Sequence, residues 1–587
     1  MNEAWNLNPI YRGFEDPAFD ADMQNLRRLA QGYNAFAAGL GGLDALTGLK
    51  QGIAWQEELT AQAMKLFDYA QLRQSVDTRD SQAGSYMGQV MQILSTTAGA
   101  EAAWKAWAAA QPDLMELVRG DESLADYVFL FENLLKGSTH LLGEKGEEIA
   151  AKFAMSGGSA WADLQSYLTS TVPVAYNGET INLAAVRNLA HDADPDVRRA
   201  AYEAELACYD RIRDAVAFAL NSIKLETISD CQLRGYASPL ERTLEHSYMK
   251  RETLEAMLEA IKEYLPKFRQ YLRAKGKALG HENGLPWYDL FAPMGKFTAT
   301  YDAEEAGKLL VELFATFDAE LADMVARAFE EEWIDFYPRS GKVGGAFCAD
   351  VGAIGQSRIL TNFDRQYGDV VILAHELGHA FHNQCVRPHR ILNHAYSMPV
   401  AETASTFNEC VVNTAAYARA ESREEKLALL ETQLKNMTQV ICDIYSRYLF
   451  EASVFEKREA QFLDADALCE LMNQAQEQSY GEGLAPDCRH PYMWICKSHY
   501  YGPTFYNFPY AFGALFARGL YTQYEKEGAA FVPKYKKLLY TTPIASVEDA
   551  AKVAGIDLTD KEFWRSALQS VAAQIDLFCT LVEEKTC

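Results

Sequence analysis

The sequence of 587 residues predicts a mainly α-helical protein. Long segments place apolar residues three and four positions apart, with charged residues between them, which is the pattern of amphipathic helices. Hydrophobic residues make up 49% of the chain, an ordinary value for a folded globular protein. Strand signals are few by comparison. A chain of this length can bury a large core, so we expect a folded body built mostly from helices.

Amphipathic helices are expected in four segments. Their residue ranges are 20–38, 54–71, 88–110 and 251–275. The polar run His191–Asp196 contains a proline of the kind that opens a helix, so another helix is expected to begin there. We place a domain boundary at this point. Residues 1–190 would form a helical N-terminal region, and residues 191–587 would form a second region that is also helical.

Three segments favour β-structure. Residues 172–183 read VPVAYNGETINL, in which two short runs flank Asn177-Gly178, a strong signal for a two-residue hairpin turn. Residues 342–347 and 357–362 also favour extended backbone. A small β element is therefore expected within the helical body.

Charge and cysteine content narrow the class of protein. The formal charge of −26 argues against a nucleic-acid partner, because binding a phosphate backbone requires clustered Lys and Arg. The eleven cysteines include no CxxC pair and none lies in the first 207 residues, a distribution that favours a reducing compartment over a disulfide framework. The N-terminus lacks the basic and apolar parts of a secretion signal, and no apolar run approaches the length of a membrane span. We therefore expect a cytoplasmic protein that partners neither nucleic acid nor membrane.

The most informative motif lies in residues 370–383, which read VVILAHELGHAFHN. On a helix, residues four apart share a face, so His375 and His379 can present imidazole nitrogens to one metal ion. Glu376 projects about 100° round the helix from His375, where it can reach a metal-bound water without replacing it. This HExxH pattern suits peptide hydrolysis, because the metal polarises the scissile carbonyl and acidifies the water while the carboxylate takes the proton.

A chance HExxH on an ordinary helix is the alternative. The preceding VVILA run predicts a buried helix, and buried imidazoles and carboxylates need partners that a metal supplies. Catalytic zinc takes three protein ligands and leaves one position open. The segment PVAETASTFNE, residues 399–409, offers Glu402 as the third ligand on a helix that begins near Pro399. Glu409 lies two turns further on the same face and is a candidate to accept a hydrogen bond from a ligand imidazole.

Three further histidines lie close by in the sequence. His382 follows His379 by about one turn, and we interpret it as a structural or supporting histidine in preference to a ligand. His389 and His394 fall in a predicted loop, where we expect ordinary surface residues.

Together these motifs resemble the thimet oligopeptidase family of zinc peptidases, and within it the oligoendopeptidase F branch. The resemblance rests on AHELGHAFH followed by VAETASTFNE, in that order and at that spacing. It extends to Trp5-Asn6-Leu7 with Glu15-Asp16-Pro17, to IDFYPRSGKVGGAF (residues 334–347) and to SHYYGPTFYNFPYAFG (residues 498–513). It therefore covers nearly the whole chain.

The resemblance implies an elongated helical body with a deep channel and one Zn²⁺ per chain at the channel floor. Residues 1–190 would form part of the channel wall, and residues 191–587 would be the catalytic domain. Such a channel admits short unstructured peptides and excludes folded proteins. The implied activity is cleavage of oligopeptides at internal bonds.

The aromatic segment suggests how negative charge on the reacting oxygen is stabilised, because a tyrosine hydroxyl or an imidazole beside the metal can donate to it. By position relative to YAFG, the resemblance assigns the oxyanion role to Tyr510 and substrate contact to His499. The family's second tyrosine is open here, because Phe508 replaces a tyrosine; Tyr501 and Tyr506 are both candidates. The alternative for these two residues is an aromatic stripe in the core.

The glycines before residue 347 suggest a place for substrate. Gly344 and Gly345 carry no side chains and would let another backbone approach, so an extended peptide could pair with this edge at Ala346 and its neighbours. The alternative is that these glycines only form a tight turn.

We therefore expect a zinc-dependent oligoendopeptidase with His375, His379 and Glu402 as metal ligands and Glu376 as general base. Tyr510, together with the metal, would stabilise the oxyanion. Two alternatives stay open: a zinc carboxypeptidase on a similar helical scaffold, and a peptide-binding protein that has lost catalysis. The intact metal motif argues against the second alternative.

Overall fold

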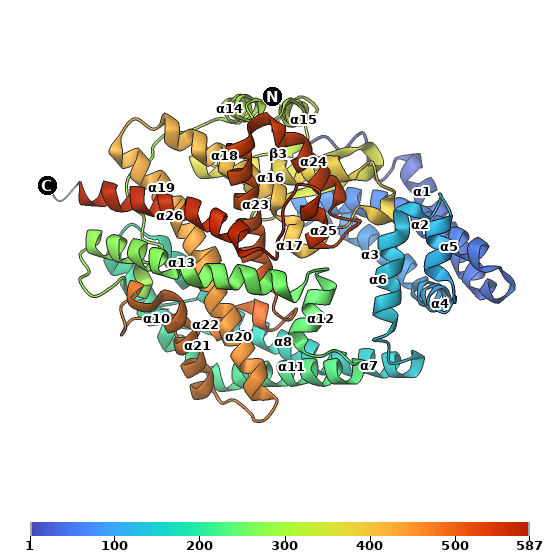
Figure 1. Cartoon of the computed structure of the whole chain (residues 1–587), viewed down its shortest axis with the longest axis horizontal. Helices are drawn as coiled ribbons and strands as arrows, with labels where there is room; N and C mark the ends of the chain where they lie inside the picture. Colours follow the sequence, from blue (N-terminus) through green and yellow to red (C-terminus); the bar gives the residue numbers. More distant parts are fainter. Residues whose placement is uncertain (1–2, 585–587) are drawn as a thin grey trace.

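The computed structural model describes residues 3–584 and is built almost wholly from α-helices (Figure 1). The mainly α fold with a small β element that the sequence predicts is confirmed. The first helices lie at the right of Figure 1, the next ones form the lower part of the body, and the chain then returns to the upper part. The last helices lie in the middle and upper parts of the body.

The N-terminal part of the chain is helical except for one hairpin. Its helices are α1 (Pro17–Ala38), α2 (Ala45–Val76), α3 (Ser81–Ser95), α4 (Ala98–Ala109), α5 (Leu114–Gly120), α6 (Val128–Ser138), α7 (Glu144–Ser156), α8 (Gly158–Thr171) and α9 (Leu183–Asn188). Between the last two, β1 (Val174–Tyr176) and β2 (Glu179–Ile181) pair antiparallel. Asn177 and Gly178 have φ of 49° and 80°, the left-handed values that a tight hairpin turn requires. The predicted hairpin is confirmed.

The next part of the chain builds the lower body and then the top. Its helices are α10 (Pro195–Tyr209), α11 (Arg213–Arg234), α12 (Pro239–His246), α13 (Arg251–Ala278), α14 (Ala303–Ala315) and α15 (Ala319–Glu330). Helix α10 begins at Pro195, as predicted, and the side chain of Asp194 caps it. Helix α13 continues through Pro266.

A three-stranded sheet and eleven α-helices complete the described chain up to residue 584. The strands are β3 (Ile334–Asp335), β4 (Phe347–Val351) and β5 (Gln356–Leu360). Strand β5 lies in the middle, parallel to β3 and antiparallel to β4. The helices are α16 (Tyr367–Val386), α17 (Met398–Ala401), α18 (Thr403–Arg419), α19 (Arg423–Thr438), α20 (Ile444–Arg458), α21 (Ala465–Tyr480), α22 (Met493–Cys496), α23 (Phe508–Glu527), α24 (Val532–Thr541), α25 (Val547–Lys552) and α26 (Lys561–Glu583), of which α22 is a single turn.

The helix predicted over residues 88–110 is wrong in one respect, because it is interrupted. Helices α3 and α4 are separated at Thr96 and Thr97. The hydroxyls of these two residues donate to backbone carbonyls three residues earlier, at 2.6 and 2.8 Å. Such side-chain bonds compete with the backbone ladder and favour a helix end, which the periodicity of apolar residues does not reveal.

The extended segment predicted over residues 342–347 is also wrong. Gly344 and Gly345 form a bend, with Gly345 at a φ of 78°, and the strand begins only at Phe347, where pairing with Leu360 starts. The glycines therefore make a turn into the strand. The other predicted segment, residues 357–362, is confirmed as most of β5.

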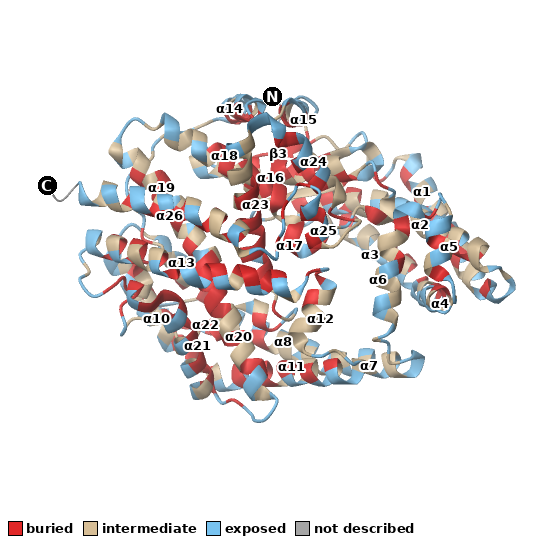
Figure 2. Cartoon of the chain, in the orientation of Figure 1, coloured by how far each residue is buried: buried red, intermediate tan, exposed pale blue. Residues whose placement is uncertain are grey.

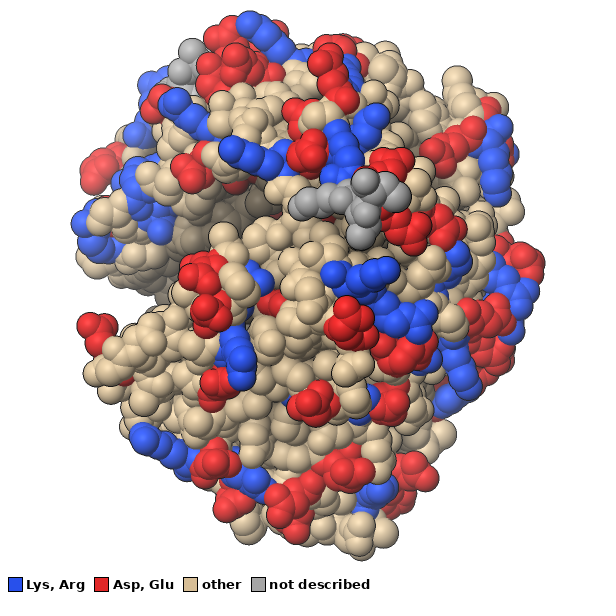
Figure 3. Space-filling view, turned by 90° about the vertical axis from the view of Figure 1, so that its left-hand side faces the viewer, with Lys and Arg blue, Asp and Glu red and all other residues tan. Residues whose placement is uncertain are grey.

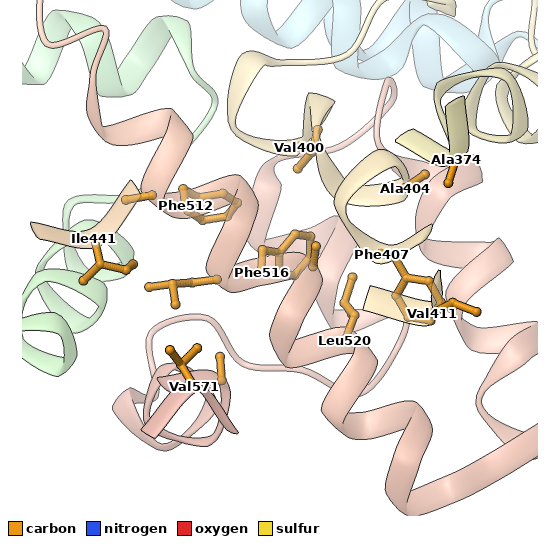
Figure 4. Packing of buried hydrophobic residues seen from close by; sticks show 14 of the residues in the cluster. Ala374, Val400, Ala404, Phe407, Val411, Ile441, Phe512, Phe516, Leu520 and Val571 are labelled. Carbon is orange, nitrogen blue, oxygen red and sulfur yellow. The ribbon is translucent and has the colours of Figure 1, made fainter. Parts of the chain in front are cut away.

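Helices α16, α18, α23 and α26 form the centre of the body. Buried residues, red in Figure 2, concentrate on these helices, whereas α7 at the lower right has no buried residue. Figure 4 shows Phe407 and Val411 of α18 beside Phe516 and Leu520 of α23, with Val571 of α26 in the same cluster. This apolar contact holds the central helices in place.

Helices α16 and α18 approach each other unusually closely at Gly378. A Cβ at this position would lie 2.5 Å from the carbonyl oxygen of Ala404 and 2.5 Å from Cα of Ser405. Only glycine permits two backbones to meet at this distance. Across the same contact, the side-chain nitrogen of Asn408 on α18 donates to the backbone carbonyl of Ala374 on α16 at 3.1 Å.

The lower part of the body has a hydrophobic core of its own. It joins residues 172–223 with residues 450–501. At its border Lys224 of α11 and Glu451 of α20, 1% and 0% exposed, form a buried ion pair at 2.7 Å. This core draws on both sides of residue 190, and a domain boundary near that residue stays a prediction.

The surface carries charges of both signs. On the face drawn in Figure 3, acidic and basic side chains are interspersed, and the surface is deeply hollowed at the left. None of the described helices combines the length and the apolar character that crossing a membrane would require. The ten cysteines within residues 3–584 are free thiols.

We expect Gly378→Ala to destabilise the protein, because the added Cβ would meet the backbone of α18, which no side-chain rotation can relieve. Overpacking of this kind costs about 1–3 kcal/mol. Gly368→Ala is a matched control on the same helix, since its Cβ would have nothing within 4 Å. That change should be neutral or stabilise by about 0.5–1 kcal/mol. Thermal unfolding followed by circular dichroism compares the two variants, and equal melting temperatures would contradict the close approach.

Candidate active site

Helix α16 presents the two histidines of the HExxH motif to one point. The ring centroids of His375 and His379 lie 4.9 Å apart. Oε2 of Glu402 lies 3.2 Å from Nε2 of His375 and 3.5 Å from Nε2 of His379. Among residues 3–584, these are the side chains whose ligand atoms, all within 4.8 Å of one another, could hold a metal ion. Two imidazole nitrogens and a carboxylate oxygen form the donor set that a catalytic zinc site uses.

Glu402 stands at the junction of two helices. Helix α17 ends at Ala401 and α18 begins at Thr403, so the single helix expected here is broken at Glu402 itself. The hydroxyl of Ser405 donates to Oε2 of Glu402 at 2.8 Å. A Cβ at Gly513 of α23 would lie 3.1 Å from Cβ of Glu402, so this glycine lets α23 pack directly on the carboxylate's stem.

Glu409 contacts the other ring nitrogen of His375. Nδ1 of His375 and Oε1 of Glu409 are 2.6 Å apart. The carboxylate can only accept, so Nδ1 carries the proton and Nε2 is the nitrogen turned towards Glu402. Glu409 therefore lies where it can orient a ligand imidazole, as the sequence suggested.

The carboxylates and imidazoles shift one another's pKa values. Burial opposes a charge on His375, but its hydrogen bonds to the carboxylates of Glu402 and Glu409 outweigh burial and raise its pKa to about 10. Burial lowers the pKa of His379 to about 4. Burial also opposes the charge on Glu402, yet the hydrogen bond from His375 prevails and holds its pKa at about 2. Near neutral pH, His379 is therefore neutral and Glu402 is charged, the forms in which both can bind a metal ion.

Glu376 occupies a drier position than the other acids of the site. Glu376 is only 6% exposed to solvent. Burial raises its pKa to about 7, with His375 opposing and Glu402 and Glu409 adding to the rise. A carboxyl group that titrates near neutrality can both take and return a proton at physiological pH.

His499, Tyr506 and Tyr510 form an aromatic group beside the metal-ligand candidates. The hydroxyl of Tyr510, in the first turn of α23, lies 3.5 Å from Nε2 of His499, and the ring of Tyr506 is centred 5.8 Å from each of the other two. Burial raises the pKa of Tyr510 to about 12, and Glu402 contributes to the rise. Burial lowers the pKa of His499. Near neutral pH, Tyr510 therefore keeps the proton that it could donate.

Tyr501 lies in a different environment from Tyr506. Its hydroxyl donates to the carbonyl of Trp494 at 2.9 Å, and its ring is buried in the lower core. Tyr500 is fully buried in the same core. Of the two tyrosines that the sequence left open, Tyr506 is therefore the one that lies with His499 and Tyr510.

The remaining histidines of this region have structural partners. His382 is fully buried, its Nε2 lies 2.8 Å from the hydroxyl of Thr542, and its ring stacks on Tyr396 at 4.0 Å. The surface position expected for His389 is wrong. It is 6% exposed, because its Nε2 lies 2.7 Å from the carbonyl of Tyr540 and holds the loop against the body. Nε2 of His394 lies 3.0 Å from the carbonyl of His389.

A cavity of about 680 Å³ begins at His375 and Glu376. Helices α16, α18, α19 and α23 line it, together with Ala346 just before β4. Its walls are mixed, with apolar side chains such as Ile372 and Met437 and a single permanent cation, Arg518, among the described residues that line it. A molecule bound in this cavity would therefore contact His375, one of the candidate metal ligands, and Glu376.

The glycine-rich turn leads directly into Ala346, which lines the same cavity. Gly344 and Gly345 are exposed, and the side-chain nitrogen of Asn362 donates to the carbonyls of Val343 and Gly345 at 3.0 and 2.8 Å. Strand β4, which follows, pairs with β5 along one edge; no strand within residues 3–584 pairs with its other edge. The turn is therefore held from behind and leaves an open strand edge next to it.

Reasoning from the sequence missed the two glycines on which these distances depend, Gly378 and Gly513. Both stand inside the quoted motifs, and a glycine within a helical pattern is a signal for close backbone approach. It also missed Arg518. The available signal was its spacing of eight residues from Tyr510, which puts both on one face of a helix.

Family models and related proteins that match this chain are described as peptidases or oligopeptidases. The family model for peptidase family M3 matches residues 188–570, and one described as oligopeptidase F matches residues 105–172. The chain is 24% identical to oligopeptidase PepF of Bacillus subtilis (strain 168), over 99% of this chain and 86% of that protein. A crystal structure of a Chlamydophila abortus protein, 20% identical, has a TM-score of 0.88 and covers 99% of this chain and 98% of its own.

A second solved structure, oligoendopeptidase-F from Enterococcus faecium, has a TM-score of 0.70 at 17% identity and covers 96% of this chain and 99% of its own. The resemblance to the oligoendopeptidase F branch is thereby confirmed. The family M3 match spans more than half of the chain and encloses the candidate metal ligands. The chain therefore belongs to peptidase family M3 and is a metallopeptidase that hydrolyses peptide bonds.

Proposed function

We propose that this metallopeptidase is a zinc-dependent oligoendopeptidase, which cleaves internal bonds of short unstructured peptides. His375, His379 and Glu402 would hold Zn²⁺. The observation that carries the proposal is that His375, a member of this donor set, and the buried Glu376 both line one cavity of about 680 Å³. Relatives that are named oligoendopeptidase F support a peptide as the substrate.

Each group near the donor set would have one task in the reaction. When bound, zinc polarises the scissile carbonyl and makes a water easier to deprotonate. Glu376 takes the proton of the attacking water and delivers it to the leaving amine, a role that a pKa of about 7 supports. Tyr510 donates a hydrogen bond to the carbonyl oxygen as that oxygen gains negative charge. His499 and Tyr506 contact the substrate beside it, and Glu409 orients His375.

The substrate backbone would lie against the glycine-rich turn that precedes β4. Gly344 and Gly345 present no side chains, Ala346 lines the cavity, and the free edge of β4 continues from them. Hydrogen bonds from a strand edge recognise the peptide main chain and ignore side-chain identity. This arrangement supports cleavage of many sequences, provided that the peptide is extended.

Glu376→Gln should reduce hydrolysis of an internally quenched, end-blocked peptide of about ten residues by about a hundredfold or more, because the amide cannot take a proton. Zinc content, measured by atomic absorption, should stay near that of the wild type, since Glu376 is not a ligand in this proposal. Chelation should stop the wild-type reaction, and added zinc should restore it.

The outcome of that assay also separates the alternatives. Turnover of unblocked peptides alone would identify a carboxypeptidase or another exopeptidase. Zinc and peptide binding without any turnover would indicate a binding protein. Full activity in Glu376→Gln would show that another residue is the base.

Zinc binding at pH 7 should release about one proton. The proton comes from His375, whose pKa of about 10 keeps it charged at this pH, whereas His379 at about 4 and Glu402 at about 2 have already lost theirs. Zinc affinity should therefore fall as the pH decreases. Calorimetric titrations in two buffers of different ionisation enthalpy count the released protons. A value of zero would contradict this protonation pattern.

Tyr510→Phe should lower kcat by about a hundredfold with little change in KM, because the lost hydroxyl acts on charge that develops only in the transition state. Tyr501→Phe is the matched control, since its hydroxyl donates to the carbonyl of Trp494 inside the core. It should lower stability by about 1 kcal/mol and leave kcat unchanged. If Tyr501→Phe were the variant that lost kcat, the assignment of Tyr510 would be wrong.

A further inference from the structure

We propose that Arg518 of α23 binds a carboxylate group of the peptide substrate, a few residues from the bond that is cut. This inference rests on the proposed peptidase function of the same cavity. It adds a charged anchor to a site whose other described contacts with substrate would be to the peptide backbone.

Arg518 lies on the cavity side of the helix that also carries Tyr510. Tyr510, Ala514 and Arg518 are spaced by four residues and share one helix face, and the last two line the cavity. Because Gly513 packs against Glu402, this contact fixes the position of α23 along its axis relative to the donor set. Arg518 lies five residues further on, about 7.5 Å along the helix axis.

This offset sets the distance between the anchor and the reacting bond. An extended peptide advances about 3.3 Å per residue. A carboxylate held by Arg518 would therefore lie about two or three residues from the scissile bond.

The guanidinium group of Arg518 is free to bind a carboxylate. Within residues 3–584, no carboxylate oxygen lies within 4.0 Å of it. By contrast, Arg419 of α18 pairs with Glu312 at 2.6 Å. Glu409, which also lines the cavity, is already engaged by Nδ1 of His375 at 2.6 Å.

One contact orients Arg518 without using its charge. Nε donates to the hydroxyl of Ser570 on α26 at 2.7 Å. The two terminal nitrogens remain for a ligand, with the thiol of Cys410 as their neighbour on α18. A guanidinium fork matches a carboxylate in shape and donor direction. Thr432 and Asn436 of α19 line the same cavity and offer neutral donors.

The carboxylate could be the C-terminus of the peptide or the side chain of an Asp or Glu residue. Both present the same group to Arg518. A C-terminal carboxylate would make the enzyme favour bonds near the end of short peptides, whereas a side chain would make it favour acidic sequences. The experiment below separates these two sources.

The test uses three internally quenched peptides of one sequence on the zinc-loaded full chain. The first ends in a free carboxylate, the second in a carboxamide, and the third in a carboxamide with a Glu introduced at the penultimate position. kcat/KM is measured for each, and mass spectrometry locates the cut. The variants are Arg518→Ala, Arg518→Lys and the control Lys526→Ala. Lys526 is also a cation of α23 that donates to a serine of α26, Ser566 at 3.3 Å, but it is exposed and does not line the cavity.

We expect the wild type and Lys526→Ala to prefer at least one carboxylate peptide over the plain carboxamide by about tenfold or more. The cut should fall about two or three residues from the carboxylate. Arg518→Ala should lose the preference, and Arg518→Lys should keep part of it, because lysine retains the charge without the fork. Preference for the first peptide identifies the C-terminus, and preference for the third identifies a side chain.

Equal kcat/KM for all three peptides in the wild type would overturn the inference, as would a preference that persists in Arg518→Ala. Binding gives an independent readout: peptide affinity is measured by fluorescence anisotropy on Glu376→Gln, with and without Arg518→Ala. If no peptide is hydrolysed by the wild type but binding depends on both the carboxylate and Arg518, the proposed function fails and this inference stands. If hydrolysis is metal-dependent without any carboxylate preference, the proposed function stands and this inference fails.

Discussion

The close approach of three helix backbones, those of α16, α18 and α23, is the constraint on which the site depends. Helices with ordinary side chains at the contact pack with axes about 8–10 Å apart. Here Gly378 brings α16 onto the start of α18, and Gly513 brings α23 onto Glu402. The ligand atoms of the two histidines and Glu402 can lie within 4.8 Å of one another because no Cβ separates these backbones. The large apolar contacts between α18 and α23, which include Phe407 and Phe516, hold the arrangement from the other side.

Charge in this half-buried site is balanced internally. Removing carboxylates and imidazoles from water is costly unless they bond to one another. His375 lies between Glu402 and Glu409, and the resulting hydrogen bonds move its pKa in the opposite direction from that of His379, one turn away. Glu376 on the same helix has no such partner and titrates near neutrality. Groups of the same type thereby acquire different roles from their surroundings, which is how a single site can both bind a cation and move a proton.

The aromatic segment that precedes α23 links the two halves of the body. Tyr500 and Tyr501 are anchored in the lower core, whereas Phe508 and Phe512 belong to the central core. His499 lies directly before the first anchors and Tyr506 lies between the two pairs; both meet Tyr510. The position of these groups relative to Glu402 is therefore a property of how the lower and central parts pack together. One cavity between helices of the central part is lined both by His375 and Glu376 and by Arg518.

The sequence alone determined the features that depend on neighbours along the chain. Helical periodicity, the Asn177-Gly178 turn and the one-turn spacing of His375 and His379 are local and were correctly predicted, apart from the break between α3 and α4. Which of Tyr501 and Tyr506 joins the site was decided by tertiary structure. The chain turns at Phe505, with φ of 51° and its N–H bonded to the buried Glu451. The ring of Tyr501 lies in the lower core, whereas the ring of Tyr506 lies beside His499 and Tyr510. The burial of His389 and the unpaired charge of Arg518 likewise follow from which elements meet, and contacts between residues far apart in the sequence leave no local pattern from which they can be predicted.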